Sequence, residues 1–309
     1  MDYQKQGSAW QSLFLLLIFT LVCAFVTQLL AVIGYLLFSG DFRSILQSQD
    51  MSGIMGSKGF LYTSLMVSSL GTFLFPALLL QQREKQVFDY FPTEKNQIIK
   101  LLLLTLLFLL AFNPSMEWIS RLNQQMMLPD SLGGIEEWMR DKEDSMADLT
   151  ENIVMVDNIP GLLLNILVMA IVPAIVEEYY FRGALQGILG RIIPNMHVAI
   201  WLTAIIFSAI HVQFYGFFPR MILGLIFGYA FYWSKNIWVP IFGHFINNFT
   251  VTLVAYYYQK QGKSFQDLQN MESYSTVYYI LSVVFSIALG YYFYQVTHKK
   301  KIYEQSQLG

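Results

Sequence analysis

The sequence has one cysteine and few charged residues. Cys23 is alone, which excludes an internal disulfide and any metal site built from several cysteines. Charged residues make up 13% of the chain, against about 25% in ordinary globular proteins. The formal net charge of -2 gives no electrostatic reason to expect a nucleic-acid partner. Hydrophobic residues are abundant at 55%, and this composition is typical of a polytopic membrane protein.

Eight apolar runs are candidates for membrane-spanning helices. One crossing needs about 20 apolar residues, and the third and sixth runs are short by this measure. The runs cover residues 13–38, 60–80, 98–112, 162–189, 196–214, 218–233, 237–257 and 276–296. The expected fold is all-α: a single integral membrane domain over residues 1–309, built as a bundle of about eight transmembrane helices.

The long polar stretch at residues 113–158 is acidic, and we expect an extramembrane loop there. Within it, residues 131–146 have the pattern of a short amphipathic helix, but a solvated loop is the favoured interpretation. Basic residues, including the cluster at 299–301, are denser in the segments that would face one side of the membrane. The positive-inside rule then places both termini in the cytoplasm. The expected location is the plasma membrane of a bacterium.

Three of the apolar runs carry polar side chains that lipid would reject. Charged groups inside a membrane cost several kcal/mol, so they usually face the bundle interior or a water-filled cavity and pair there. We therefore expect these three helices to turn their polar groups toward one shared pocket. The groups are Glu177, Glu178 and Arg182 in the fourth run, His211 in the fifth, and His244, Asn247 and Asn248 in the seventh.

Such a pocket is sufficient for hydrolysis. A carboxylate removed from water is suited to general-base catalysis, and a histidine can position the water. A second histidine and an asparagine can donate hydrogen bonds to a developing oxyanion. Glu178 and Arg182 are four residues apart, the spacing of a helical ion pair. We interpret them as an orienting salt bridge and Glu177 as the catalytic group.

Structural and metal-dependent interpretations also exist. The Glu178–Arg182 pair could serve packing alone, and a lone intramembrane histidine could be an interhelical donor. The joint occurrence of all these groups favours a functional site. Two histidines with a glutamate are a familiar zinc set, which would use Glu177, His211 and His244. No HExxH spacing occurs, so zinc is the second choice and no cofactor is expected to be required.

Three motifs resemble those of a known family. EEYYFR (177–182), FSAIH (207–211) and HFINN (244–248) are similar to the EExxxR, FxxxH and HxxxN motifs of the CPBP intramembrane proteases, also called Abi. This family includes the type II CAAX prenyl endopeptidases and bacteriocin-processing or bacteriocin-immunity proteins. The motifs follow the family's order across roughly residues 160–255, whereas residues 1–155 carry none. The resemblance implies about eight transmembrane helices, with the catalytic core at 160–255.

The resemblance also implies roles for individual residues. By motif position, Glu177 would activate water together with His211, while His244 and Asn248 would form the oxyanion site. Glu178, Arg182 and Phe207 would then support this set. The family was long described as metalloproteases, but a glutamate-dependent mechanism is its better-supported description. Asn247 falls outside the motif spacing and is not assigned to the site.

The expected function is therefore that of an intramembrane endopeptidase. Its substrate would be a membrane-associated protein or peptide, and its other partner the lipid bilayer. The alternative is a non-enzymatic membrane protein, either a peptide-binding immunity factor or a transporter, that uses the same polar cavity.

Overall fold

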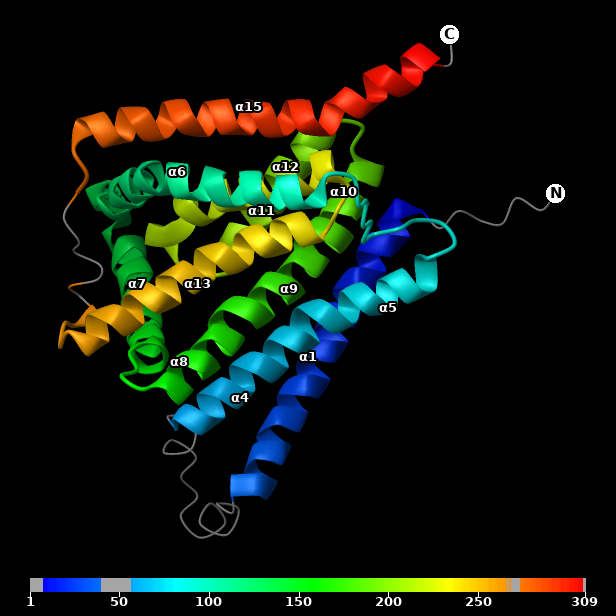
Figure 1. The fold of residues 1–309 in the computed structure, drawn as a ribbon. Helices are drawn as coiled ribbons and strands as arrows, with labels where there is room; N and C mark the ends of the chain where they lie inside the picture. The colour runs from blue at the N-terminus through cyan, green and yellow to red at the C-terminus, as the bar shows by residue number, and fades with distance from the viewer. Residues whose placement is uncertain (1–7, 40–56, 266, 268–272, 308–309) are drawn as a thin grey trace.

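The computed structural model describes residues 8–39, 57–265, 267 and 273–307. Within these ranges the chain is helical, with one isolated β-bridge between Thr93 and Asn236 and no strand. Figure 1 shows the helices packed into one bundle, in which α15 lies beside α6 and α1 beside α4 and α5. The all-α fold is confirmed.

The elements follow the expected apolar runs closely. Where helical elements succeed one another without a gap, they form one continuous helix. The elements are α1 (Ala9–Ser39), α4 (Lys58–Ser69), η1 (Leu70–Leu74), α5 (Phe75–Glu84), α6 (Ile98–Gln124), η2 (Asp130–Leu132), α7 (Gly133–Val154), α8 (Ile159–Asn165), η3 (Ile166–Ile171), α9 (Val172–Glu178), η4 (Tyr179–Leu185), α10 (Gln186–Ile192), α11 (Met196–Ala209), η5 (Phe214–Gly216), α12 (Phe217–Ser234), α13 (Trp238–Lys260) and α15 (Thr276–Gln307).

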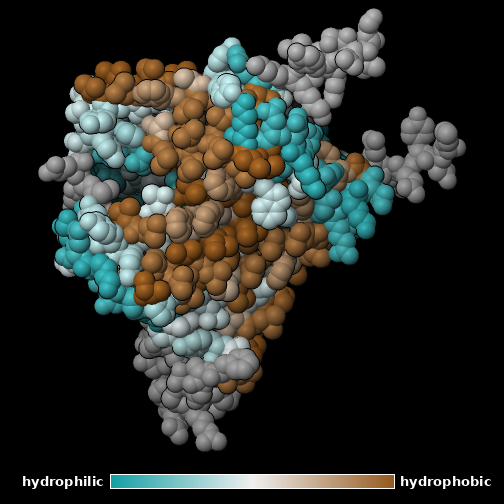
Figure 2. All heavy atoms as spheres, viewed as in Figure 1, coloured by the Kyte–Doolittle hydropathy of each residue, from teal (hydrophilic) through white to brown (hydrophobic). Residues whose placement is uncertain are grey.

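Seven of the eight expected runs are helical to within one residue of their bounds, whereas the fifth, expected over 196–214, is helical only to Ala209, so His211 lies just beyond the end of its helix. Six segments of the described chain are both long and apolar enough to cross a membrane. These are Ala9–Leu37, Lys58–Glu84, Ile98–Gln124, Ile159–Ile192, Phe214–Ser234 and Thr276–His298. The other two runs form α11, with 14 residues, and α13, with 23. At about 1.5 Å per residue, α11 is roughly 21 Å long, shorter than the hydrocarbon core of about 30 Å. Figure 2 shows a broad apolar face across the bundle, and the protein is an integral membrane protein.

The third span extends well beyond its predicted end at residue 112. α6 continues through Pro114 to Gln124, although a proline inside a helix removes a backbone hydrogen bond. Ser282 of α15 compensates: its hydroxyl donates to the Ala111 carbonyl at 2.6 Å, and its oxygen accepts from the Ser115 amide at 3.1 Å. A hydroxyl from a neighbouring helix thus satisfies backbone groups beside the proline. Residues 113–124 are therefore part of a helix and not of a loop.

The rest of the acidic stretch is also mostly helical. α7 covers Gly133–Val154, so the favoured interpretation of a solvated loop is wrong and the amphipathic helix is longer than the expected 131–146. One reason is contact with the bundle: the Trp138 ring lies 5.3 Å from the ring of Phe214 in η5. At the other end, Asn165 donates to the Ile153 carbonyl at 2.9 Å. A ring contact at one end and a hydrogen bond at the other thus hold this helix against the bundle.

Close approach of α11 and α12 shapes the region behind the polar residues. A methyl group at Gly224 would lie 3.0 Å from the Ala204 Cβ atom, so no larger residue fits without movement. This contact brings Phe207 of α11 and Phe227 of α12 close enough to flank the same arginine, Arg182.

Candidate functional site

The two adjacent glutamates lie on α9 in the middle of one continuous helix. π-helical segments precede and follow α9, at η3 and η4, and such segments are frequent at functional sites. Neighbouring residues on a helix point in directions about 100° apart. Accordingly, Glu177 lines a cavity, whereas the side chain of Glu178 is completely buried among the helices.

The cavity brings together side chains from three separate parts of the sequence. Its volume is about 220 Å³. α9 contributes the glutamate, the chain from α11 to α12 contributes a histidine and an arginine, and α13 contributes a histidine and two asparagines. The lining residues are Glu177, Phe207, His211, Arg220, Leu223, Phe227, His244, Asn247 and Asn248. The four residues expected to be catalytic thus all face one space.

Glu178 is the centre of a buried ionic network behind the cavity. Its Oε1 atom accepts hydrogen bonds from Arg182 Nη1 and from His244 Nδ1, each at 2.8 Å. The expected ion pair four residues apart is therefore present, and His244 extends it. A carboxylate can only accept, so His244 Nδ1 carries a proton. The other ring nitrogen, Nε2, lies 3.9 Å from Glu177 Oε2.

Arg182 is enclosed by aromatic rings. Its guanidinium carbon lies 4.6 Å from the Phe207 ring centroid and 5.6 Å from that of Phe227, distances suited to cation–π attraction. Arg182 Nε and Glu178 Oε2 are buried without a hydrogen-bond partner in the described chain. Because desolvation offsets most of the attraction in a buried pair, such a pair is weak evidence for stability. Its clear geometric effect is to hold His244 in place.

Aromatic rings also position the two histidines. Phe207 lies 5.2 Å from the His211 ring, and its carbonyl is 2.8 Å from His211 Nδ1. The Phe227 ring stacks on the His244 ring at 5.5 Å and an angle of 17°. Phe207 was expected as a supporting residue. Phe227 was not, because an aromatic residue in an apolar run gives no signal in the sequence.

The two asparagines of α13 form a pair at the cavity wall. Asn248 Nδ2 donates to the Met169 carbonyl of η3 at 3.1 Å, and Asn247 Nδ2 donates to Asn248 Oδ1 at 3.1 Å. A carboxamide has two N–H donors, so these contacts orient the Asn248 group without using all of its donors. Asn247, which the motif spacing left out of the site, lines the cavity as well.

Arg220 is a further residue that the sequence analysis missed. It lies near the start of α12, where its guanidinium donates to Gln213 through Nη2 at 2.5 Å and Nη1 at 3.4 Å. The signal was available, because a charged residue in the run 218–233 is as expensive in a membrane as those that were noticed. Arg220 was therefore recognisable in the same way as Glu177.

The zinc alternative named Glu177, His211 and His244 as ligands. In the part of the chain that the structure describes, no three or more His, Cys, Asp or Glu side chains form a group that could hold a metal ion. Glu177, His211 and His244 line the same cavity but do not form such a group.

Fold and site together define a polytopic helical membrane protein with a polar cavity between its helices. Residues 159–250 match the model of a family described as type II CAAX prenyl endopeptidase Rce1-like. This segment contains all three motifs, so the resemblance drawn from them is confirmed there.

Two proteins of Bacillus subtilis (strain 168) are similar to part of the chain. One is named "Putative membrane peptidase YdiL" and is 31% identical over 100 residues, which cover 32% of this chain and 41% of the relative. The other, "Uncharacterized protein YpbD", is 28% identical over 86 residues, which cover 26% of this chain and 41% of the relative. The chain thus spans about two fifths of the length of these relatives. No solved structure gives a significant match.

Proposed function

We propose that this protein is an intramembrane glutamic endopeptidase that hydrolyses a peptide bond of a membrane-associated protein or peptide. The observation that carries the proposal is the convergence of Glu177, His211, His244 and Asn248 on one small cavity between the helices. The peptidase names of the matching family and of one relative support it.

The first step is activation of water. Glu177 takes a proton from a water molecule that His211 helps to position, and the water oxygen attacks the carbonyl carbon of the substrate. Glu178 is unsuited to this role because its side chain is completely buried and does not line the cavity, whereas that of Glu177 does. The network leaves one glutamate for proton transfer and uses the other for positioning.

The second step is stabilisation and collapse of the tetrahedral intermediate. Asn248 and His244 donate hydrogen bonds to the oxyanion. His244 donates through Nε2 while Nδ1 donates to Glu178, which requires that both ring nitrogens carry protons. The carbon–nitrogen bond then breaks, and protonated Glu177 returns its proton to the leaving amine. The products are a new carboxyl terminus and a new amino terminus.

The test is a proteomic comparison of membranes that contain wild-type protein or the Glu177→Ala variant. Uncleaved substrates should accumulate in the variant membranes, while the variant protein reaches the membrane in normal amounts. Identical fragment patterns in the two membranes would contradict the proposal. Retained biological activity in protein that lacks both Glu177 and His211 would instead support a non-enzymatic peptide binder or transporter.

Metal independence is a separate part of the proposal. A mechanism that relies on Glu177 predicts that purified protein keeps its cleavage activity after exhaustive chelation. Elemental analysis should find no stoichiometric zinc in the active sample. Loss of activity on chelation, restored by adding zinc, would contradict the glutamate mechanism.

We also propose a plasma-membrane protein of a bacterium, with both termini in the cytoplasm. The connection between α5 and α6 contacts the one between α12 and α13, since the Glu94 amide donates to the Lys235 carbonyl at 3.1 Å. In Figure 1 the start of α1, this first connection and the end of α15 lie on the same side. Lys5 and the side chains of 299–301 lie outside the described residues. Reporter fusions to each terminus test the orientation.

A further inference from the structure

Arg220 is a cation in the cavity that the proposed reaction does not use. The other intramembrane arginine described above, Arg182, has a carboxylate at 2.8 Å. In contrast, no carboxylate oxygen of the described chain lies within 4.0 Å of the Arg220 guanidinium. Its hydrogen bonds go to Gln213, which is neutral. The Arg220 side chain is half-buried, and the acidic groups that act on it, Glu177 and Glu143, do so only from beyond ion-pair distance. A cation without a directly paired carboxylate is costly in a membrane, which favours an anionic ligand at this position.

The guanidinium retains donors for a ligand. Arginine has five N–H groups in a planar fork, and two contacts to Gln213 leave the others available. Arg182 Nε is buried without a hydrogen-bond partner in the described chain. Each nitrogen of Arg220, in contrast, either has a partner or is not fully buried. Because Arg220 lines the cavity, we infer that its remaining donors open toward it. The planar fork matches the two oxygens of a carboxylate.

The position of the guanidinium is also fixed before any ligand arrives. A methyl group added at Gly216 would lie 2.7 Å from Arg220 Nη1, so the guanidinium packs closely against this glycine. Gln213 holds it from another side at 2.5 Å. A donor group that is already ordered loses less conformational entropy on binding.

We propose that Arg220 forms a subsite that binds a carboxylate of the peptide substrate. The carboxylate belongs either to the C-terminus or to an acidic side chain, and both present the same two oxygens. The inference rests on the proposed function in one respect, since it takes a peptide as the occupant of the cavity. In this position Arg220 would fix the substrate relative to Glu177, which lines the same cavity.

Three amphiphilic probes test the subsite without requiring cleavage. The first is a dodecanoyl dipeptide with a free C-terminal carboxylate, the second is its carboxamide, and the third is a carboxamide with a glutamate side chain. Binding is measured by calorimetry in nanodiscs, using full-length protein with Glu177→Gln to prevent hydrolysis. The same titrations are repeated with Arg220→Gln added.

Protein that retains Arg220 should bind at least one carboxylate probe about 10- to 100-fold more tightly than the plain carboxamide, the range for hydrogen bonds to charged groups. The carboxylate probe that binds more tightly shows whether the carboxylate comes from the C-terminus or from a side chain. With Arg220→Gln, the ratio of the dissociation constant of the plain carboxamide to that of the carboxylate probe should fall to about 1. Equal binding of all three probes to protein that retains Arg220 would overturn the proposal. A ratio that persists in Arg220→Gln would overturn it as well, because Arg220 would then be structural.

Two further variants separate the possible failures. Arg121→Gln is the matched control, since Arg121 is paired with Glu117 elsewhere, and it should keep the full ratio. Arg220→Lys retains the charge but not the fork, and it should keep part of the ratio even where Arg220→Gln does not fold. Binding is measured in Glu177→Gln protein and does not depend on cleavage. The binding test can therefore fail while the proteomic test succeeds, and the binding test can succeed while the proteomic test fails.

Discussion

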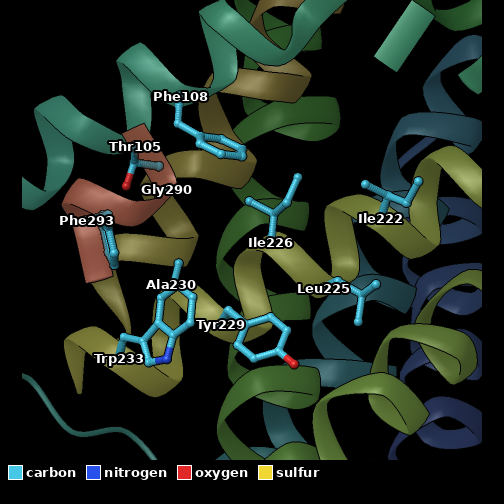
Figure 3. A pocket seen from close by; sticks show the side chains of 10 residues that line it. All are labelled: Thr105, Phe108, Ile222, Leu225, Ile226, Tyr229, Ala230, Trp233, Gly290 and Phe293. Atoms are coloured by element: carbon cyan, nitrogen blue, oxygen red, sulfur yellow. The ribbon is translucent and has the colours of Figure 1, made fainter. Parts of the chain in front are cut away.

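Two cavities of similar size lie along α12, and they differ in almost every other respect. The one that contains Glu177 and Arg220 measures about 220 Å³. The other, between α6, α12 and α15, measures about 240 Å³ and appears in Figure 3, where the labelled side chains are almost entirely hydrocarbon and aromatic. Volume therefore does not distinguish the two. The polar groups that line the first cavity mark it as the candidate site.

The two cavities also use α12 differently. Arg220, Leu223 and Phe227, which are spaced by three and four residues, line the polar cavity. Ile222, Ile226 and Trp233 line the apolar one. One helix thus separates the two environments because its side chains alternate at the helical period. A substitution on α12 should have consequences that depend on which cavity it reaches.

The largest difference between the cavities should appear when the proposed base is neutralised. Glu177→Gln keeps the shape of the side chain but cannot accept the proton from water, so kcat/KM should fall about 100- to 10,000-fold. The measurement is cleavage of a substrate from the proteomic comparison by purified protein. Glu137→Gln, the same change at an exposed position of α7, is the control and should leave the rate unchanged. Equal rates for the two variants would remove Glu177 from the mechanism.

The next effect concerns the ionic network behind the polar cavity. Arg182→Gln leaves Glu178 buried without its countercharge and should lower the free energy of unfolding by about 3–5 kcal/mol. Thermal unfolding in detergent measures this change. The double variant Arg182→Gln, Glu178→Gln removes both charges and should be more stable than the single variant. Equal stability of wild type and Arg182→Gln would show that the pair is not energetically coupled.

A smaller loss is expected where α11 and α12 touch. Gly224→Val forces a side chain against Ala204, where a methyl group would already lie at 3.0 Å. The expected cost is about 1–3 kcal/mol of stability, with reduced cleavage because Phe207 and Phe227 flank Arg182 in the same region. Gly134→Val is the matched control, since open space surrounds Gly134. The two variants should differ in melting temperature.

The smallest effect, and one of opposite sign, is expected in the apolar cavity. Gly290 lies inside α15 and lines this space, and an added methyl group would meet Phe108 at an ordinary distance of 3.5 Å. Gly290→Ala should raise stability by about 0.5–1 kcal/mol, the usual gain when alanine replaces glycine inside a helix. Cleavage should not change. A loss of activity as large as that of Glu177→Gln would mean that the apolar cavity is part of the site.

Much of the fold was predictable because a bilayer imposes a simple length rule. Each of the eight apolar runs forms a helix, although the fifth ends at Ala209, and polar residues from three runs meet in one cavity. The extension of α6 beyond residue 112 could not be predicted. Pro114 normally ends a helix, and the serine that compensates for it, Ser282, is 167 residues away from Ser115 in the sequence. Long-range contacts of this kind leave no local pattern.

The candidate site likewise contains residues that the sequence reveals and residues that it does not. Glu177, His211 and His244 were recognisable because polar residues stand out in apolar runs. Arg220 stands out equally and was recognisable by the same rule. Phe227 was not, because its role depends on stacking against a residue of another helix. Sequence reasoning thus finds groups that are expensive to bury, and the structure is needed to find the apolar groups that orient them.

The two π-helical segments beside α9 have a consequence for how this helix tolerates change in its length. A π segment holds an extra residue that the α-helical pattern does not need. Loss of one residue from Ile166–Ile171 or Tyr179–Leu185 can be absorbed by conversion of that segment to α-helix, so the residues on either side keep nearly their present directions. A single-residue insertion or deletion within α9 itself has no such outlet and would rotate one side of the helix by roughly 100° relative to the other. The direction of the Glu177 carboxylate is therefore sensitive to the length of α9 and tolerant of length changes in the segments beside it.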